Sequence, residues 1–225
     1  NFWPRNSISQ RTTPYGLPNT AIMRAEETIM AANNATTSID AITQTTGNDT
    51  LLISSSDVMQ AEDQFDGDAG TDTIVISAPV GGTIDLRPAA NAFTGYEAMS
   101  FSNSTGSTSV VQLDASQFGA GAGLLPMNLT LWGSTGAQTI QIFAANNFNA
   151  STFSFALSTW TDAEDLIQIF GTEDADTLVG SIKRDRLEGG AGDDTYTVNL
   201  ITDTVVENAD EGTDTVNSSV TYTLA

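Results

Sequence analysis

A nine-residue period in the last third of the chain is the feature that most constrains its fold. Divided every nine residues from Gly171, the sequence reads GTEDADTLV, GSIKRDRLE and GGAGDDTYT, and a degenerate fourth unit follows at Val198–Val206. The sixth position is always aspartate and the eighth is always a large apolar residue: Asp176, Asp185, Asp194 and Asp203, with Leu178, Leu187, Tyr196 and Val205. A short, strict period is typical of solenoids, in which each repeat stacks on its neighbours and buries a continuous core.

Each unit can be interpreted physically as a turn of six residues followed by a strand of three. The residue at the eighth position is expected to point inward and fill a thin core. Glycines at the first, second and fourth positions allow backbone angles that are closed to other residues. The carbonyl oxygens of such a turn can face a cation, and the aspartate adds a carboxylate. Calcium favours about six to eight oxygen ligands of this mixed kind.

The pattern resembles the RTX, or haemolysin-type, calcium-binding nonapeptide G-G-x-G-x-D-x-U-x, which Gly189–Thr197 matches at every specified position. The resemblance implies a parallel β-roll in which two nonapeptides make one turn and calcium lies between loops two repeats apart. The loop 171–176 would then stack on 189–194, with Asp176 and Asp194 as side-chain ligands. The calcium-binding residues predicted in this region are Gly171, Asp174, Asp176, Gly189, Gly190, Gly192 and Asp194.

The repeat between these two loops departs from the pattern. Lys183 and Arg184 occupy the places of the central glycine and its neighbour. Because a loop with two positive charges repels a cation, it is a poor calcium site. We therefore expect one edge of the roll to bind calcium well and the opposite edge to bind it poorly or not at all. Arg184 or Arg186 would neutralise the aspartates of that opposite edge.

A second match to the frame lies upstream, at Gly67–Val75. Asp68 replaces the second glycine there, and an aspartate directly precedes the match. The second predicted set of metal-binding residues is Asp66, Asp68, Gly70 and Asp72. Thr46–Leu51 and Gly212–Val216 are partial matches. For Asp49 and Asp214, which belong to these partial matches, a solvated turn is the favoured interpretation.

The rest of the chain consists of short apolar runs, several with a period of two, separated by Gly, Asn, Asp, Ser and Thr. Such runs are typical of short, half-buried strands. We predict an all-β fold, a parallel β-solenoid with coils over residues 46–170 and an RTX-type β-roll over 171–225 that continues beyond this sequence. A β-sandwich is the alternative for residues 77–165. Residues 1–45 are predicted to be irregular, with a short helix from Asn19 or Thr20 to about Met30.

The composition narrows the partners and the chemistry. Asp and Glu number 28 against 7 Lys and Arg, which gives a net charge of −21. Nucleic acid is not an expected partner, because phosphate binding needs clustered positive charge, and membrane insertion is not expected either. No apolar run reaches the roughly 18–20 residues that span a bilayer. The chain has no Cys and no His, which excludes thiolate chemistry, histidine triads and zinc sites of the usual ligand types.

The residues and the resemblance predict a calcium-binding structural or adhesive module of a secreted or surface-layer bacterial protein, which folds on binding extracellular Ca²⁺. The resemblance also implies type I export to the outside or the cell surface of a Gram-negative bacterium. The expected partners are calcium, other copies or further coils of the same protein, and glycan. No catalytic residue is predicted, since the acidic cluster at 162–165 is expected to be a turn. The alternative is an accessory or catalytic β-helix of a secreted polysaccharide-active enzyme.

Overall fold

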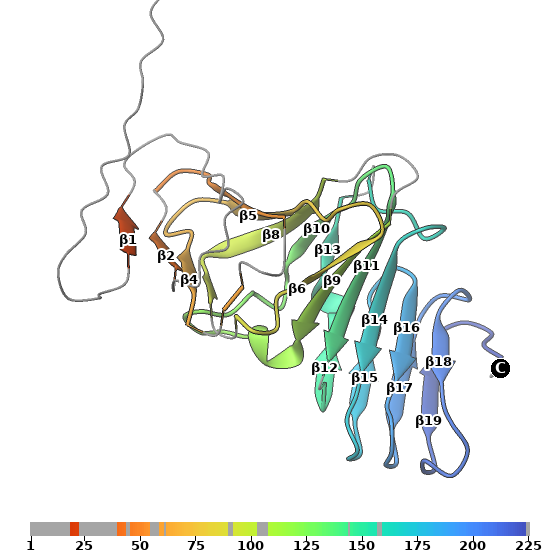
Figure 1. Cartoon of the computed structure of the whole chain (residues 1–225). Helices are drawn as coiled ribbons and strands as arrows, with labels where there is room; N and C mark the ends of the chain where they lie inside the picture. The colour runs from red at the N-terminus through yellow and green to blue at the C-terminus, as the bar shows by residue number, and fades with distance from the viewer. Residues whose placement is uncertain are drawn as a thin grey trace, which may run out of the picture.

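Every strand pair in the computed structural model is parallel, and the strands follow one another around the axis of a solenoid (Figure 1). The structure describes residues 19–22, 40–43, 46–54, 59–60, 62–89, 92–102, 108–143, 145–156 and 159–223. Within these ranges there are two single-turn 3-10 helices, Ala115–Gln117 and Ala150–Thr152, and no α-helix. The prediction of an all-β parallel solenoid is confirmed, and the sandwich alternative for residues 77–165 is wrong.

The strands are short and form four sheets. Sheet A contains β1 (Asn19–Ile22), β2 (Asp40–Thr43), β4 (Gln64–Asp66) and β7 (Phe93–Thr94). Sheet B contains β3 (Thr50–Ile53), β5 (Asp72–Ile76), β8 (Tyr96–Phe101), β10 (Thr130–Trp132) and β13 (Ser154–Phe155). Sheet C contains β6 (Gly82–Asp85), β9 (Thr108–Asp114), β11 (Ala137–Phe143), β14 (Leu166–Phe170), β16 (Asp185–Glu188) and β18 (Thr204–Val206). Sheet D contains β12 (Asn147–Asn149), β15 (Thr177–Val179), β17 (Thr195–Val198) and β19 (Thr215–Ser218).

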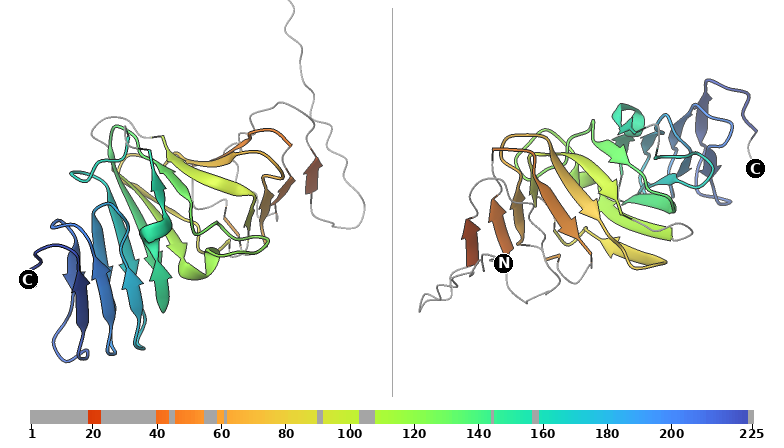
Figure 2. Two further views of the ribbon diagram at one scale, coloured as in Figure 1. Left: turned by 180° about the vertical axis from the view of Figure 1, so that it is seen from behind. Right: turned by 90° about the horizontal axis from the view of Figure 1, so that it is seen from above.

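The N-terminal coils have three faces. The chain passes from sheet A to sheet B to sheet C, as in β4–β5–β6 and again in β7–β8–β9. One turn of these coils is long, since Thr50 pairs with Thr73 in the next coil and Val110 pairs with Thr139. Figure 2 shows these coils from two further directions. A turn of this length encloses a wide core.

The C-terminal coils have only two faces. From β14 onward the chain alternates between sheets C and D, one strand per face. Thr177 pairs with Thr195 and Arg186 pairs with Thr204, so that each turn contains two nonapeptides. The last turn is longer by two, since Thr195 pairs with Thr215. Two nonapeptides per turn is the geometry that the RTX resemblance implies.

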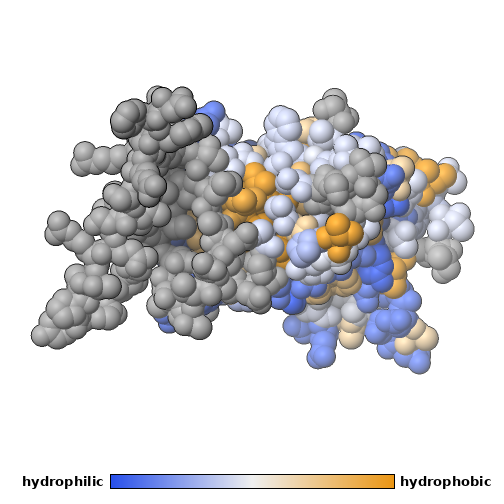
Figure 3. Space-filling model, turned by 45° about the horizontal axis from the view of Figure 1, so that its top comes forward, coloured by the Kyte–Doolittle hydropathy of each residue, from blue (hydrophilic) through white to orange (hydrophobic). Residues whose placement is uncertain are grey.

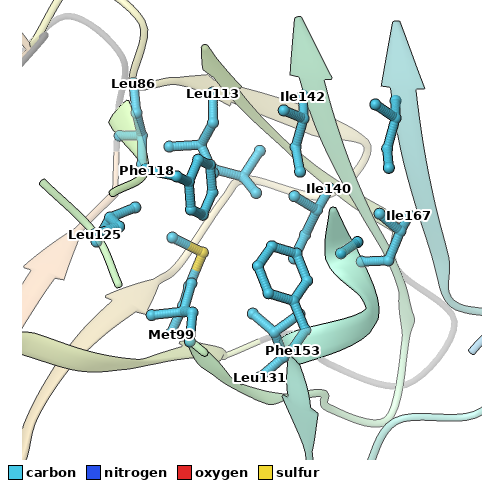
Figure 4. Close-up of a cluster of buried hydrophobic side chains, with 14 of the residues drawn as sticks. Leu86, Met99, Leu113, Phe118, Leu125, Leu131, Ile140, Ile142, Phe153 and Ile167 are labelled. Atoms are coloured by element: carbon cyan, nitrogen blue, oxygen red, sulfur yellow. The ribbon is translucent and has the colours of Figure 1, made fainter. Parts of the chain in front are cut away.

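Sheet C continues through both parts and carries a column of inward side chains. Leu113, Ile142, Ile169, Leu187 and Val205 are paired in register from β9 to β18, and all are buried. Figure 4 shows Leu86, Leu113 and Ile142 in a row above the rings and aliphatic chains of the wide core. The period-two pattern of the sequence produces this column, because alternate residues of a strand point to opposite faces.

Two further predictions concern the organisation of the chain. The helix predicted from Asn19 or Thr20 is wrong where the structure describes it, because Asn19–Ile22 forms β1 and pairs with β2. Its helical spacing was brief, and parallel pairing onto sheet A supplies the hydrogen bonds that so short a helix could not make. The rest of that segment lies outside the described residues. The boundary predicted at residue 170 stays a prediction; β14, which ends there, pairs with β11 on one side and with β16 on the other.

Candidate calcium-binding loops

Three loops stack along one edge of the C-terminal roll, at the lower edge in Figure 1. They are residues 171–176, 189–194 and 207–214, which lead into β15, β17 and β19. Their contact requires glycine: Gly190 has φ +101°, and a Cβ on it would lie 2.1 Å from the carbonyl oxygen of Thr172. Glycines of the repeat therefore allow the backbone of one coil to lie directly on that of the next.

The sixth-position aspartates of this edge form a hydrogen-bonded ladder. The backbone N–H of Asp176 donates to Oδ1 of Asp194 at 2.7 Å, and the N–H of Asp194 donates to Oδ1 of Asp214 at 3.0 Å. Asp176 and Asp194 are buried, and Asp214 is half-buried. The fold thus brings three carboxylates from successive coils into one line, with no basic side chain in the ladder itself.

The charges of neighbouring carboxylates dominate the electrostatics of this edge. Burial raises the pKa of Asp194, and the neighbouring carboxylates of Asp176 and Asp214 raise it further. Among the described residues, Oδ1 of Asp176 is buried without a hydrogen-bond partner. A buried, unpartnered carboxylate oxygen is costly unless a cation or a proton compensates it.

The oxygen atoms around this edge fit a hard divalent cation. A Cβ built on Gly171 would lie 2.3 Å from the carbonyl oxygen of Gly189 and 2.5 Å from Oδ2 of Asp176. The absence of a side chain at Gly171 therefore allows a carbonyl oxygen and a carboxylate oxygen from two coils to lie close together. Calcium accepts mixed carbonyl and carboxylate ligands of this kind. When bound, it would supply positive charge to the ladder.

The structure brings together six of the seven residues predicted here. Gly171 and Asp176 lie in the first loop, and Gly189, Gly190, Gly192 and Asp194 lie in the second, stacked directly on it. Asp174 differs, because its carboxylate is exposed. Its carbonyl oxygen lies 2.9 Å from the position that a Cβ would take on Gly192. Asp174 thus contacts this stack through its backbone in this structure.

Two acidic residues at the end of this edge were missed as candidate ligands. Glu207 and Asp214 each offer a carboxylate oxygen that, with one from Asp194, forms a group whose atoms all lie within 4.8 Å. Burial raises the pKa of Glu207, and Tyr196 donates its hydroxyl hydrogen to that carboxylate. The hydroxyl oxygen of Tyr196 accepts the N–H of Gly189 at 2.7 Å. Asp214 belongs to the partial match Gly212–Val216, for which a solvated turn was the favoured interpretation.

The opposite edge contains built-in positive charge. The guanidinium of Arg184 donates to the carbonyl oxygens of Asp165 at 3.2 Å, Glu164 at 3.2 Å and Ala163 at 3.4 Å. Nζ of Lys183 lies 3.6 Å from Oδ1 of Asp162. Arg184 thus binds carbonyls of the preceding loop, as a cation would. The role expected of Arg184 or Arg186 was to neutralise the aspartates of this edge, whereas Arg184 contacts backbone carbonyls.

Arg186 does not take that role. It points from the outer face of sheet C, pairs with Glu188 at 2.6 Å and lies over the ring of Phe170. The aspartates of this edge still repeat the ladder, since the N–H of Asp185 donates to Oδ1 of Asp203 at 3.0 Å. Burial raises the pKa of Asp185 well above its ordinary value, and Asp203 adds to the shift. Asp185 thus lies buried beside a second carboxylate, and its Oδ2 has no hydrogen-bond partner among the described residues.

The upstream set lies on another edge, at the entrance to sheet B. Asp72 is buried at the start of β5, and Oδ1 of Asp66 accepts the N–H of Asp68 at 3.0 Å. Gly70 lies against the loop at Gly47, one coil earlier. The two predicted sets of metal-binding residues are therefore separate places in the solenoid.

The acidic cluster before β14 forms a turn. The carboxylate of Asp165 accepts the N–H of Gln138 at 2.9 Å and that of Thr161 at 2.6 Å. The carboxylate of Asp162 forms an ion pair with Lys183. Asp165 thus caps backbone donors at the entrance to β14, as in a turn. Of the three tryptophans of the chain, Trp160 is buried, Trp132 is 48% exposed and Trp3 lies outside the described residues.

Comparison with known proteins identifies the repeat region. Residues 170–200 match the family model described as RTX calcium-binding nonapeptide repeat (4 copies). This segment is therefore an RTX repeat region, a structural motif that binds Ca²⁺ and occurs in secreted bacterial proteins. No curated protein and no solved structure matches the chain. Within the described residues, no helix is long and apolar enough to cross a membrane.

Proposed function

We propose that this chain is a structural module of a secreted or surface-layer bacterial protein, and that its C-terminal roll folds when it binds extracellular Ca²⁺. The observation that carries the proposal is the ladder of Asp176, Asp194 and Asp214, stacked coil on coil with a buried, unpartnered carboxylate oxygen. The predicted calcium ligands of the roll lie in the two stacked loops 171–176 and 189–194. Glu207 and Asp214 extend the set at the last coil.

Coupling between binding and folding follows from the charge. Without a cation, the carboxylates of successive coils repel one another, and a chain of net charge −21 gains nothing from bringing them together. The unfolded chain has no preformed site, so the free energy of binding becomes free energy of folding. A bacterial cytosol poor in calcium would keep the roll unfolded, and calcium outside the cell would fold it.

An adhesive or surface-layer role is the finer part of the proposal. Hydrophilic residues gather on the side of the C-terminal coils in Figure 3, as suits a solvated surface. Further coils or other copies of the same protein are the proposed protein partners, and glycan is a further one. No observation on the described residues favours the polysaccharide-active enzyme, and we do not propose it.

Far-UV circular dichroism of the chain in chelator, titrated with Ca²⁺ and separately with Mg²⁺, tests the proposal. We expect a calcium-selective gain of β signal. Asp194→Asn should raise the calcium midpoint at least about tenfold, which corresponds to about 1.4 kcal/mol. Glu173→Gln is the matched control, because it removes the same charge from an exposed position of the first loop. An identical, fully folded spectrum in chelator and in calcium would contradict the proposal.

A further inference from the structure

A pair of stacked segments in the N-terminal coils repeats the hydrogen bonds of a pair in the roll. Oδ1 of Asp72 accepts the N–H of Asp49 at 2.7 Å, as Oδ1 of Asp214 accepts that of Asp194 at 3.0 Å. The backbone bonds next to them also agree: Thr73 N–H to Asp49 O at 3.0 Å, and Thr215 N–H to Asp194 O at 2.8 Å. Residues 47–49 and 70–72 thus form the same kind of aspartate ladder as the roll.

The agreement includes the loops beside the aspartates. The N–H of Thr71 donates to the side chain of Asn48 at 3.0 Å, and that of Thr213 donates to the side chain of Asp193 at 2.8 Å. Cβ atoms on Gly70 and Gly212 would lie 2.2 Å and 1.9 Å from the carbonyl oxygens of Gly47 and Gly192. The coil between the upstream aspartates is longer than the coil between those of the roll. The same loop structure therefore forms on two coil lengths.

A third coil completes the upstream stack. The N–H of Asp72 donates to Oε2 of Glu97 at 2.8 Å. A Cβ on Gly67 would lie 2.7 Å from Oδ2 of Asp72 and 2.7 Å from the carbonyl oxygen of Gly95. Glycine at position 67 thus allows a carboxylate oxygen and a carbonyl oxygen from neighbouring coils to approach the same place beside its backbone.

The carboxylate that borders this place is buried and incompletely satisfied. Asp72 is 0% exposed, and its Oδ2 has no hydrogen-bond partner among the described residues. Burial raises the pKa of Asp72 to about 6, and the charges of Glu97, Asp49 and Asp68 add to the shift. All three neighbours are acidic. A hard divalent cation would satisfy the oxygen and neutralise the group at once.

We propose that a second site for a hard divalent cation, Ca²⁺, lies between the stacked segments 47–49, 67–72 and 95–97. Oδ2 of Asp72 and the carbonyl oxygen of Gly95 are its inner ligands. Asp49, Asp68 and Glu97 supply the surrounding negative charge. The site lies outside the RTX match at 170–200, and it stabilises the three-faced coils independently of the roll.

Hydrogen exchange measured by mass spectrometry on the full chain, combined with equilibrium dialysis of Ca²⁺, tests this site. Calcium should protect the amides of residues 47–53 and 70–76. Asp72→Asn should remove one bound ion per chain and abolish this protection, while calcium still protects residues 177–198. Asp194→Asn should instead remove the calcium-dependent protection of residues 177–198 and keep that of residues 47–53 and 70–76. Glu62→Gln is the control, since it removes one charge from a nearby exposed position and should bind as many ions as the wild type.

Gly67→Ala provides a second test that keeps every carboxylate. Its methyl group would crowd both Oδ2 of Asp72 and the carbonyl oxygen of Gly95, the two proposed inner ligands, and we expect at least about tenfold weaker binding at this site alone. If Asp72→Asn does not fold in saturating calcium, Gly67→Ala decides the question. The inference is overturned if the folded variants bind as many ions as the wild type, or if calcium leaves exchange at residues 47–76 unchanged in the wild type. A roll that fails to respond to calcium would instead contradict the proposed function.

Discussion

The three-faced coils and the two-faced roll share sheet C but differ in what fills them. The wide coils enclose aromatic rings: Phe118 contacts Phe148 and Phe153 at centroid distances of 5.2 Å and 5.7 Å, and Trp160 lies 6.2 Å from Phe101. The roll has one or two inward side chains per strand, namely Leu178, Leu187, Tyr196, Val198 and Val205. Its strands have only three or four residues.

The difference shows how two parts of one solenoid can rely on different forces. Burial of rings and aliphatic chains in the wide coils offsets the entropy of ordering long turns. The roll buries little apolar surface per turn and places carboxylates one above another, so its own contacts do not suffice. Calcium is the added source of stability in the roll. The wide coils hold a related ladder at Asp49 and Asp72, but with a larger core beside it.

Removing calcium with a chelator should make the stabilities of the two regions differ more than any substitution does. Without calcium, the roll loses the ion that neutralises its ladder, whereas the wide coils keep their apolar core. Differential scanning calorimetry should show two transitions in calcium and only that of the wide coils in chelator. A single transition that persists unchanged in chelator would show that the roll does not depend on the ion.

Gly190→Ala should produce the next largest effect. The backbone of Gly190 has φ +101°, and a Cβ there meets the carbonyl of Thr172. We expect a loss of more than about 2 kcal/mol in the free energy of unfolding in calcium. Gly121→Ala is the matched change in the wide coils, where a Cβ would make only an ordinary contact of 3.5 Å with Leu124. Urea unfolding measures both variants, and equal losses of stability would show that the tight backbone contact at Gly190 has no special role in the roll.

Arg184→Gln should weaken the opposite edge of the roll by a smaller amount. The substitution removes the guanidinium that donates to three carbonyls of the preceding loop, and we expect a loss of about 1 kcal/mol. Arg186→Gln removes the same charge but only an ion pair on the outer face, which is worth about 0.5 kcal/mol. Thermal unfolding in saturating calcium measures both, and a larger effect of Arg186→Gln would contradict the assignment of roles.

The pH dependence of calcium-free protein should give the smallest effect, with a defined sign. Burial raises the folded-state pKa of Asp72, which lies in the wide coils, to about 6, whereas an unfolded aspartate titrates near about 3.9. The folded state therefore binds more protons between pH 4 and 6, and stability falls as pH rises through this window. Acidification from about pH 7 to about pH 5 should raise the unfolding temperature by about 2–4 °C.

The sign should reverse when calcium is present, because protons then compete with the ion for the same carboxylates. Thermal melts of calcium-free and calcium-saturated protein at each pH make the comparison. If acidification destabilises the calcium-free protein as well, the fold already stabilises the charged form of the buried carboxylates without calcium.

The nine-residue frame allowed the roll to be predicted because its turn length is fixed. Aspartate at the sixth position and an apolar residue at the eighth place Asp176 and Leu178 correctly inside β-roll coils. Glu207 and Glu97 could not be predicted in the same way, and Asp214, in a partial match to the frame, was expected to be a solvated turn. Their loops stack across turns that are longer than two nonapeptides, and only pairing in three dimensions shows which loops meet.

The N-terminal helix failed for a related reason. A few apolar residues at helical spacing are weak evidence when a neighbouring strand can accept the same segment. Asn19–Ile22 pairs along β2, a partner that is distant in the sequence and leaves no local signal. Arg184 and Arg186 could be identified as candidates for neutralising the second edge, but their positions in the sequence do not tell which one reaches the carbonyls.

Hydrogen exchange of the full chain with and without Ca²⁺, at residues 177–198 and 108–143, tests the central claim most directly. The account predicts that the roll amides exchange at nearly unfolded rates in chelator and become protected at least about a hundredfold in calcium, while magnesium has little effect. The amides of β9 and β11 should stay protected in both conditions. Equal protection of the roll with and without calcium would contradict the claim that this region folds on binding the ion.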